Sequence, residues 1–291
     1  MRAAASVARS AQELAREAPA LASLPTVYTR LTEALAKPRV STAQIAEIIA
    51  SDSALTARLL RLVNSAFYAF PSRIETVQHA VFLVGTQQIH DLALATSVLR
   101  VFAGIPPELV DMESFWRHSI ATGVTARTLA TYCNERGAER FFVAGILHDL
   151  GRLLFFAARP DAARAALVRS RTQGEPLVVA ERAVVGYDHS EAGGALLEAW
   201  NLPEDLQEMV RWHHAPADAQ RYPREAAVVH VADIIATAME LGNSGDPVVS
   251  PLVPGAWEQF GLSPTVLGAL AEQVDRQVNE VARSILPVGA P

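Results

Sequence analysis

Cysteine is nearly absent from this chain, which has a single thiol at Cys133. One thiol cannot form an internal disulfide, so nothing indicates a secreted, disulfide-bridged fold. Aromatic residues make up 7% of the chain and charged residues 19%, whereas 50% of the residues are hydrophobic. With 291 residues, this composition can bury a sizeable core in one large domain or in two smaller ones that share an interface.

Basic charge is also in short supply. The formal net charge is -6, the pI is about 5.8, and no long stretch contains a basic stripe. Nucleic-acid-binding proteins usually show such a stripe, and binding to an anionic membrane surface would need one too. We therefore expect neither direct nucleic-acid binding nor membrane association.

Targeting and membrane-spanning sequences are not evident either. Residues 1–20 contain three arginines and two glutamates and lack the unbroken apolar stretch of a signal peptide. The most apolar segment, residues 141–158, has His148, Asp149 and Arg152 in its middle, which disfavours a transmembrane helix. We expect a cytoplasmic protein.

Helix-forming residues fill most of the chain. Ala and Leu dominate, and both favour helices. Apolar residues recur at helical spacing, for example at Leu55, Leu59 and Val63, and no long stretch alternates polar and apolar residues with period two. The sequence therefore predicts an all-α fold.

Breaks in the helical pattern predict four segments. A leader helix would occupy residues 1–20, and five short helices would form an N-terminal subdomain over residues 21–106. Longer helices would form a second subdomain over residues 107–241. The last segment, residues 242–291, begins with a loop and ends with helices. It could pack on the N-terminal subdomain or form a dimer contact, and we favour packing.

Polar residues interrupt one strongly apolar helical segment. The segment FFVAGILHDLGRLLFF, residues 141–156, has only three strongly polar residues, His148, Asp149 and Arg152. Its apolar neighbours should bring Asp149 into the core, where an uncompensated carboxylate is costly. An ion pair with Arg152 at i,i+3 spacing would be one solution, and a bound metal ion would be another.

Similar polar groups stand at apolar positions elsewhere in the second half: His118, His189, His213, His214 and Asp233. Imidazole and carboxylate groups are ligands that suit Fe, Mn, Zn and Ni. If each group were an ordinary buried residue, each would need its own separate explanation. We therefore predict a site for one or two divalent transition-metal ions.

Two local patterns concern the histidines. Asp188 and Glu191 resemble a capping box, which places His189 in the first turn of a helix. His213 and His214 would end a helix that begins at Pro203, and adjacent helical side chains diverge by about 100°. These two histidines could therefore serve different roles or different ions.

In this order along the chain, the polar groups resemble the HD superfamily of metal-dependent phosphohydrolases. The N-terminal half resembles one branch, the HDOD domain (HD-related output domain), through segments such as LLRLVNSAFY, residues 59–68, and IETVQHAVFLVGTQQIHDLAL, residues 74–94. FWRHS, AGILHDLGRLLF and HVADIIA continue the resemblance to about residue 240. It implies an N-terminal helical subdomain packed on an HD-like helical bundle.

The resemblance also implies roles for the polar residues. The ligands of the basic HD site would be His118, His148, Asp149 and Asp233. The extra ligands of two-metal relatives, such as the HD-GYP cyclic-di-GMP phosphodiesterases, would be His189, His213 and His214. In such a site Asp149 would bridge two ions, a bridging hydroxide would attack a phosphoester, and Arg152 could hold a phosphate oxygen.

Three differences from those relatives narrow the expected number of metal ions and the expected substrate. The Gly-Tyr-Pro loop is missing, because APADAQRYPREAA follows His214. Arg152 stands where those enzymes have Lys, and Ser114 stands where three-metal relatives have a ligating Glu. We therefore expect no third ion, and cyclic-di-GMP is not the expected substrate.

Two functions stay open on the sequence. The first is a bacterial signal-transduction module that engages signalling proteins and could form a homodimer, with a structural or vestigial metal. The second is a phosphohydrolase or phosphodiesterase acting on a nucleotide or other phosphoester, with Asp149 and Arg152 as catalytic residues. A purely structural helical domain is a third, less favoured interpretation. A catalytic centre needs a cleft and an open metal position, which separates the first two.

Overall fold

The computed structural model describes residues 10–17, 23–102 and 104–286. No strand occurs in these ranges, and the all-α prediction is confirmed. The first half contains six helices in the described ranges: α1 (Ala11–Glu17), α2 (Thr26–Leu35), α3 (Thr42–Ala50), α4 (Ser53–Val63), α5 (Val77–Val84) and α6 (Thr86–Val98). Side-chain caps begin four of them, through Ser10 at α1, Ser41 at α3, Asp52 at α4 and Thr76 at α5.

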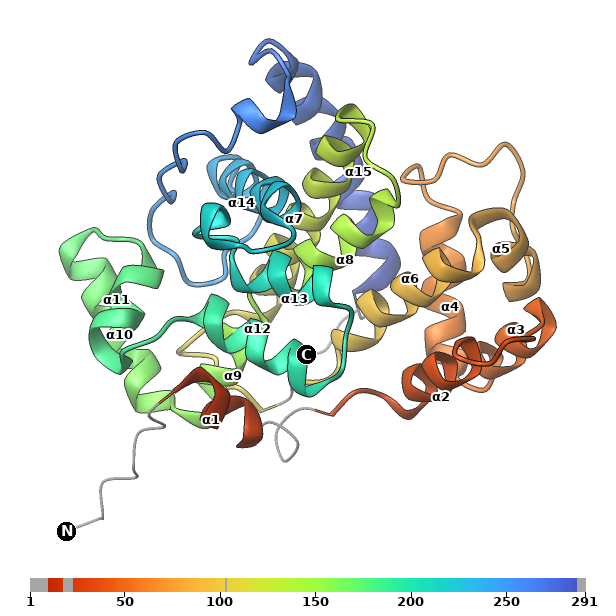
Figure 1. Ribbon diagram of the computed structural model, residues 1–291, viewed down its shortest axis with the longest axis horizontal. Coiled ribbons are helices and arrows are strands. Elements are labelled where there is room, and N and C mark those ends of the chain that lie inside the picture. Colours follow the sequence, from red (N-terminus) through yellow and green to blue (C-terminus); the bar gives the residue numbers. More distant parts are fainter. Residues whose placement is uncertain (1–9, 18–22, 103, 287–291) are drawn as a thin grey trace.

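Helices α2 to α6 pack on one another and form one side of the molecule (Figure 1). Helix α1 lies apart from them, against α12 and α9, where it buries Ala11, Leu14 and Ala15. The leader helix expected over residues 1–20 is therefore seen at Ala11–Glu17, and the rest of that range lies outside the described residues.

The second half supplies nine helices in the described ranges. They are α7 (Met112–Tyr132), α8 (Ala138–Leu147), α9 (Leu150–Ala158), α10 (Pro160–Gln173), α11 (Leu177–Val185), α12 (His189–Ala199), α13 (Glu204–Arg211), α14 (Pro223–Ala238) and α15 (Val266–Ile285). Two short 3-10 turns, η2 (Pro216–Asp218) and η3 (Glu258–Phe260), lie between them. An irregular segment joins α6 to α7, and the subdomain boundary expected near residue 106 stays a prediction.

Helices α7 and α8 cross at a pair of glycines in the centre of the fold. A Cβ on Gly145 would lie 2.4 Å from the Cα of Gly123, so only glycine permits this approach. Helix α14 packs against both α7 and α8. The crossing therefore brings the N-terminal half of α7, the end of α8 and the middle of α14 together, and each contributes polar residues to the site described below.

The run Ala138–Ala158, which spans α8 and α9, is long and apolar enough to cross a membrane by length and composition. In the fold, 89% of its most apolar window is buried. Other helices of the chain thus cover its apolar side chains.

The C-terminal helix α15 packs against α7 and α4 and so contacts both halves of the chain. Phe260 is buried, and Val253 and Trp257 pack against the same core. Leu267 is 39% exposed and takes no part in that packing. The buried apolar residues of both halves form one continuous cluster. Of this segment, α15 reaches the N-terminal helices at α4, whereas the turn Glu258–Phe260 packs on α14 of the second half.

Candidate metal centre

The seven predicted ligand residues lie together in the fold. The residues form three sets, and within each set the ligand atoms lie within 4.8 Å of one another: His118, His148 and Asp233; His148, Asp149 and His213; His189, His213 and His214. Because His148 and His213 each belong to two sets, the three sets form one continuous cluster. We call these seven residues the metal centre.

The His148–Asp149 pair lies in the turn between α8 and α9. Immediately after it, Gly151 contacts the first turn of α12, where an added Cβ would lie 1.9 Å from the carbonyl oxygen of His189. This contact brings the Oδ1 atom of Asp149 to 3.2 Å from the Nε2 atom of His189. Asp188 caps α12 by accepting from the Glu191 N–H at 3.0 Å, which confirms that His189 stands in the first turn.

The helix expected to run through His213 and His214 ends earlier, at Arg211. The Nδ1 of His213 donates to the Val210 carbonyl at 2.7 Å, and the His213 carbonyl accepts from Nδ1 of His230 at 2.7 Å. Side chains thus occupy carbonyls that further helical N–H groups would have used. The two histidines therefore do not stand on a helix, and both rings join the set that contains His189, while His213 alone also joins the set of His148 and Asp149. That they serve different roles or different ions stays a prediction.

Three imidazoles share one arrangement. Each donates from Nδ1, His148 to the Gly145 carbonyl at 2.7 Å, His213 as above, and His189 to Oε2 of Glu181 at 2.6 Å. Donation from Nδ1 fixes the ring and leaves the lone pair of Nε2 facing the other members of the centre. Metal-binding histidines are oriented in this way by an outer partner.

Asp149 stands in the middle of the centre. Its Oδ2 lies 3.3 Å from Nε2 of His148 and 3.7 Å from Nε2 of His118, while its Oδ1 faces His189. Asp233 completes one side, with Oδ1 at 3.1 Å from Nε2 of His118. One carboxylate with its two oxygens facing separate ligand sets is suited to bridge two cations.

Several of these atoms are buried and lack a hydrogen-bond partner in the described part of the chain. They are Nε2 of His148, Nε2 of His213 and both carboxylate oxygens of Asp149. Such atoms are rare and costly in folded proteins. A divalent cation would satisfy them together, so the donor set fits a metal ion. The ligand chemistry is that of Fe, Mn, Zn or Ni and does not select among them.

Without a cation, protons balance the carboxylate charges. Burial opposes the charged form of His148, but the neighbouring carboxylates of Asp149 and Asp233 raise its pKa to about 10. Burial and Arg152 oppose protonation of His189, yet Glu181 and Asp149 raise its pKa to about 9. Burial would raise the pKa of Asp149, but Arg152 and His148 hold that pKa well below its usual range.

His213 responds in the opposite direction. Burial, together with His148 and His189, lowers the pKa of His213 to about 3, and burial beside His213 and His189 holds the pKa of His214 well below its usual range. The Nε2 atoms of His214 and His189 approach to 2.9 Å. In the metal-free centre, His213 and His214 are therefore neutral, whereas His148 and His189, which lie beside Asp149, are protonated.

Arg152 is buried beside the centre, with 2% of its surface exposed. Its Nε lies 3.1 Å from Oδ1 of Asp149, so the ion pair weighed against a metal site on sequence grounds is present. Its Nη1 donates to Oγ of Ser244 at 2.8 Å, and its Nη2 to Oδ2 of Asp246 at 3.0 Å. Asp149 therefore forms an ion pair with Arg152 and also lies among the predicted metal ligands, so the ion pair does not replace the ligand cluster.

Sequence reasoning missed Glu181, Ser244 and Asp246. Glu181 is 5% exposed and accepts from both the backbone N–H and Nδ1 of His189, at 2.9 Å and 2.6 Å. The only signal in the sequence was a carboxylate among the apolar residues LVVAERAVV of α11. Ser244 and Asp246 belong to a loop whose polar composition reads as solvent-exposed.

His230, one turn before Asp233, is a structural histidine. Its Nδ1 donates to the His213 carbonyl at 2.7 Å and its Nε2 accepts from the Val253 N–H at 3.0 Å. Both ring nitrogens are therefore satisfied by backbone groups, and the ring holds His213 in place. His90 lies among the N-terminal helices, stacked on Tyr28.

Comparison with known proteins agrees with this fold. A structure of a provisionally named phosphohydrolase from Shewanella amazonensis SB2B has a TM-score of 0.72 at 24% identity, covering 95% of this chain and 99% of that one. A provisionally named signal transduction protein from Marinobacter aquaeolei VT8 has a TM-score of 0.72 at 18% identity, covering 96% and 67%. These two likenesses concern the fold.

A curated relative, an uncharacterized protein of Treponema pallidum (strain Nichols), is 29% identical over 192 residues, or 66% of this chain. The chain spans 37% of that relative's length. The sequence pattern of the HDOD domain family matches residues 21–216. That match covers α2 to α6 and every member of the metal centre except Asp233, and the chain belongs to the HDOD domain family.

Proposed function

We propose that this chain is a bacterial signal-transduction module that engages partner signalling proteins and holds one or two divalent transition-metal ions in a closed, structural centre. The observation that supports this function is the engagement of Arg152. A guanidinium that holds a phosphate must offer free N–H donors. Those of Arg152 are bound to Ser244 and Asp246 and lie against Asp149.

The loop that binds Arg152 is itself anchored. Oδ1 of Asp246 accepts from the Leu177 N–H at the start of α11 at 3.0 Å, and the Asn243 N–H donates to the Ser114 carbonyl on α7 at 3.1 Å. A Cβ on Gly242 would lie 2.4 Å from the same Ser114 carbonyl. Freeing Arg152 for a substrate would therefore require several of these contacts to break together.

Six of the seven ligand residues are buried as well, and His214 is half-buried. His148, His189 and His213 are 0% exposed and Asp149 is 1% exposed. A catalytic metal keeps a position open to water and substrate, whereas a structural metal is enclosed by its ligands. An ion bound here would join α7, the α8–α9 turn, α12, the segment after α13 and α14, and would stabilise the fold in proportion to its affinity.

The alternative function is a metal-dependent phosphohydrolase. A hollow of about 410 Å³ lies against the centre, lined by His118, Ser244 and Asp246 among others, and it has the size of a small-ligand site. A metal ion bound nearby would supply Lewis-acid activation of a phosphoester or of a water molecule. The same hollow is lined by the carboxylates of Glu240 and Asp246, which would repel a phosphate and so favour the structural reading.

Metal content and turnover should be measured on the same preparations. Protein purified without chelator would be analysed by inductively coupled plasma mass spectrometry and incubated with a panel of nucleotide and aryl phosphoesters. Asp149→Asn tests the centre, and Asp161→Asn, whose side chain is fully exposed, is the matched control.

We expect bound metal in the wild type and in the control, loss of metal in Asp149→Asn, and no phosphoester turnover in any of them. Turnover that disappears in Asp149→Asn alone would favour the phosphohydrolase. Absence of metal from the chelator-free wild type would refute the metal centre itself.

A further inference from the structure

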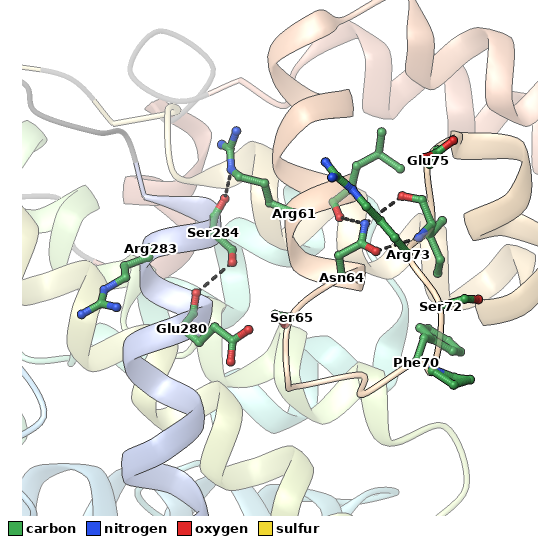
Figure 2. Close-up of a pocket in the computed structure, with 13 residues that line it drawn as sticks. Arg61, Asn64, Ser65, Phe70, Ser72, Arg73, Glu75, Glu280, Arg283 and Ser284 are labelled. Carbon is green, nitrogen blue, oxygen red and sulfur yellow. Dashed lines mark hydrogen bonds between the residues drawn. The ribbon is translucent and has the colours of Figure 1, made fainter.

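A second hollow, of about 920 Å³, lies between α4, the segment that joins α4 to α5, and α15 (Figure 2). No member of the metal centre lines it. Four of its lining residues belong to the LLRLVNSAFY segment: Leu60, Arg61, Asn64 and Ser65. This segment carries the resemblance to the HDOD domain, yet it contributes no residue to the metal centre. We call it the arginine hollow.

Hydrogen bonds hold the walls of the arginine hollow in place. The side chain of Asn64 donates to the Ile74 carbonyl at 2.8 Å and accepts from the Ile74 N–H at 2.7 Å, which closes the segment between them into a loop. Oε1 of Glu280 on α15 accepts from the Ala66 N–H at 2.8 Å. The hollow is therefore preformed, which lowers the entropy that a ligand must lose on binding.

Three arginines from three separate segments line the hollow: Arg61 of α4, Arg73 of the joining loop and Arg283 of α15. Within the described ranges none of them forms an ion pair, although the chain as a whole has a net charge of -6. Nε of Arg61 donates to the Ser284 carbonyl at 2.9 Å, which holds its guanidinium near α15 (Figure 2). Two carboxylates, Glu75 and Glu280, also line the hollow, and that of Glu280 accepts a hydrogen bond from the Ala66 N–H.

We propose that the arginine hollow binds a small organic phosphate of the nucleoside diphosphate class. Guanidinium groups bind phosphate oxygens through paired N–H donors. Figure 2 shows those of Arg61 and Arg73 beside α4, whereas Arg283 extends away from them past α15. Leu60 and Phe70 offer apolar surface to the organic part of such a molecule. The volume lies in the range of small-molecule sites, which favours a compact ligand over an extended phosphopeptide.

Binding should be measured by isothermal titration calorimetry on the full chain with ADP, GDP and CDP, beside adenosine and inorganic phosphate. Arg73→Gln and Arg283→Gln are the test variants, because neither side chain makes a hydrogen bond or ion pair in the described part of the chain. Arg276→Gln is the matched control on α15, since its exposed side chain lies 3.9 Å from Glu272 and does not line the hollow.

We expect the diphosphates to bind and adenosine not to bind. Each test variant should weaken binding by about tenfold, the order of loss for one charge-assisted hydrogen bond, while its thermal midpoint and the affinity of Arg276→Gln stay unchanged. Asp149→Asn should bind the diphosphates as the wild type does, because the metal centre is a separate site.

Four results would overturn the proposal. The first is no binding of any diphosphate at millimolar concentration. The second is equal affinity in the wild type, Arg73→Gln and Arg283→Gln. The third is a loss of binding in Asp149→Asn instead, which would place the ligand at the metal centre. The fourth is binding only to vesicles that contain anionic phospholipid, titrated in the same way, which would make the arginines a membrane contact.

Discussion

A single methyl group added at Gly151 should damage the metal centre without replacing any ligand residue. The new Cβ would lie 1.9 Å from the His189 carbonyl oxygen and 2.7 Å from the Gly193 nitrogen. Both are backbone atoms of α12, so no side-chain rotation can relieve the contact. Ordinary contact begins near 3.4 Å, and α9 must therefore withdraw from α12 by about 1.5 Å.

The size of the effect follows from that displacement. Overpacking of a core costs about 1–3 kcal/mol, and the clash of backbone with backbone places Gly151→Ala near the upper end of that range. The greater helix propensity of Ala offsets about 1 kcal/mol. We expect a net loss of about 1–2 kcal/mol in the free energy of unfolding of the metal-free protein. Because Asp149 moves away from His189, metal affinity should fall by at least about tenfold.

Gly268→Ala provides the control. Gly268 lies inside α15, and nothing lies within 4 Å of a Cβ added there. Urea unfolding of both variants after chelation, followed by metal competition against a chromophoric chelator, separates the two effects. We expect Gly268→Ala to gain about 0.5–1 kcal/mol and to keep wild-type metal affinity. If Gly151→Ala matched the wild type in both measurements, the close approach of α9 and α12 would not be what positions Asp149.

Three further predictions concern the surroundings of the ligands. Glu181→Gln removes the charged acceptor of His189 and should weaken metal binding about 10- to 100-fold with an unchanged circular dichroism spectrum; an unchanged affinity would contradict its positioning role. Metal binding at about pH 8 should release about two protons, because in the metal-free protein the pKa values of His148 and His189 are about 10 and 9 and ligation requires neutral rings. The number released should fall as the pH rises through 9 to 10, and calorimetry in buffers of different ionisation enthalpy measures it; no release at pH 8 would be inconsistent with these charges. Asp246→Asn should loosen Arg152 and speed the removal of metal by a chelator several-fold in stopped-flow measurements, whereas an unchanged rate would show that the loop does not close the centre.

The predictable part of the site consists of polar groups on apolar helices. His148 and Asp149 were identified because FFVAGILHDLGRLLFF leaves no exposed face to receive them. The same reasoning found His118 and Asp233, and the fold brings all four into contact. The apolar residues around a charged side chain predict that it will be buried, and a buried charge needs a partner whichever segment of the chain supplies it.

The unpredicted part depends on contacts between distant segments. Glu181 lies on a helix with exposed residues around it, and only the approach of α12 makes it a partner of His189. The end of α13 at Arg211 depends on the bond from His230 to the His213 carbonyl, 17 residues along the chain. No periodicity within one helix contains that information, because the competing hydrogen bonds come from other helices.

The segment after the family match supplies the hydrogen-bond partners of Arg152. The HDOD pattern ends at residue 216, yet Ser244 and Asp246 hold Arg152, and Arg283 lines the arginine hollow. An HDOD chain with the same histidines but without these loop residues would leave its arginine free to meet a phosphate. Membership in the family therefore does not by itself distinguish a catalytic centre from a structural one. On the proposed structural function, the difference rests on Ser244 and Asp246, which follow the matched residues 21–216, and Asp246→Asn assayed for phosphoester turnover tests it directly.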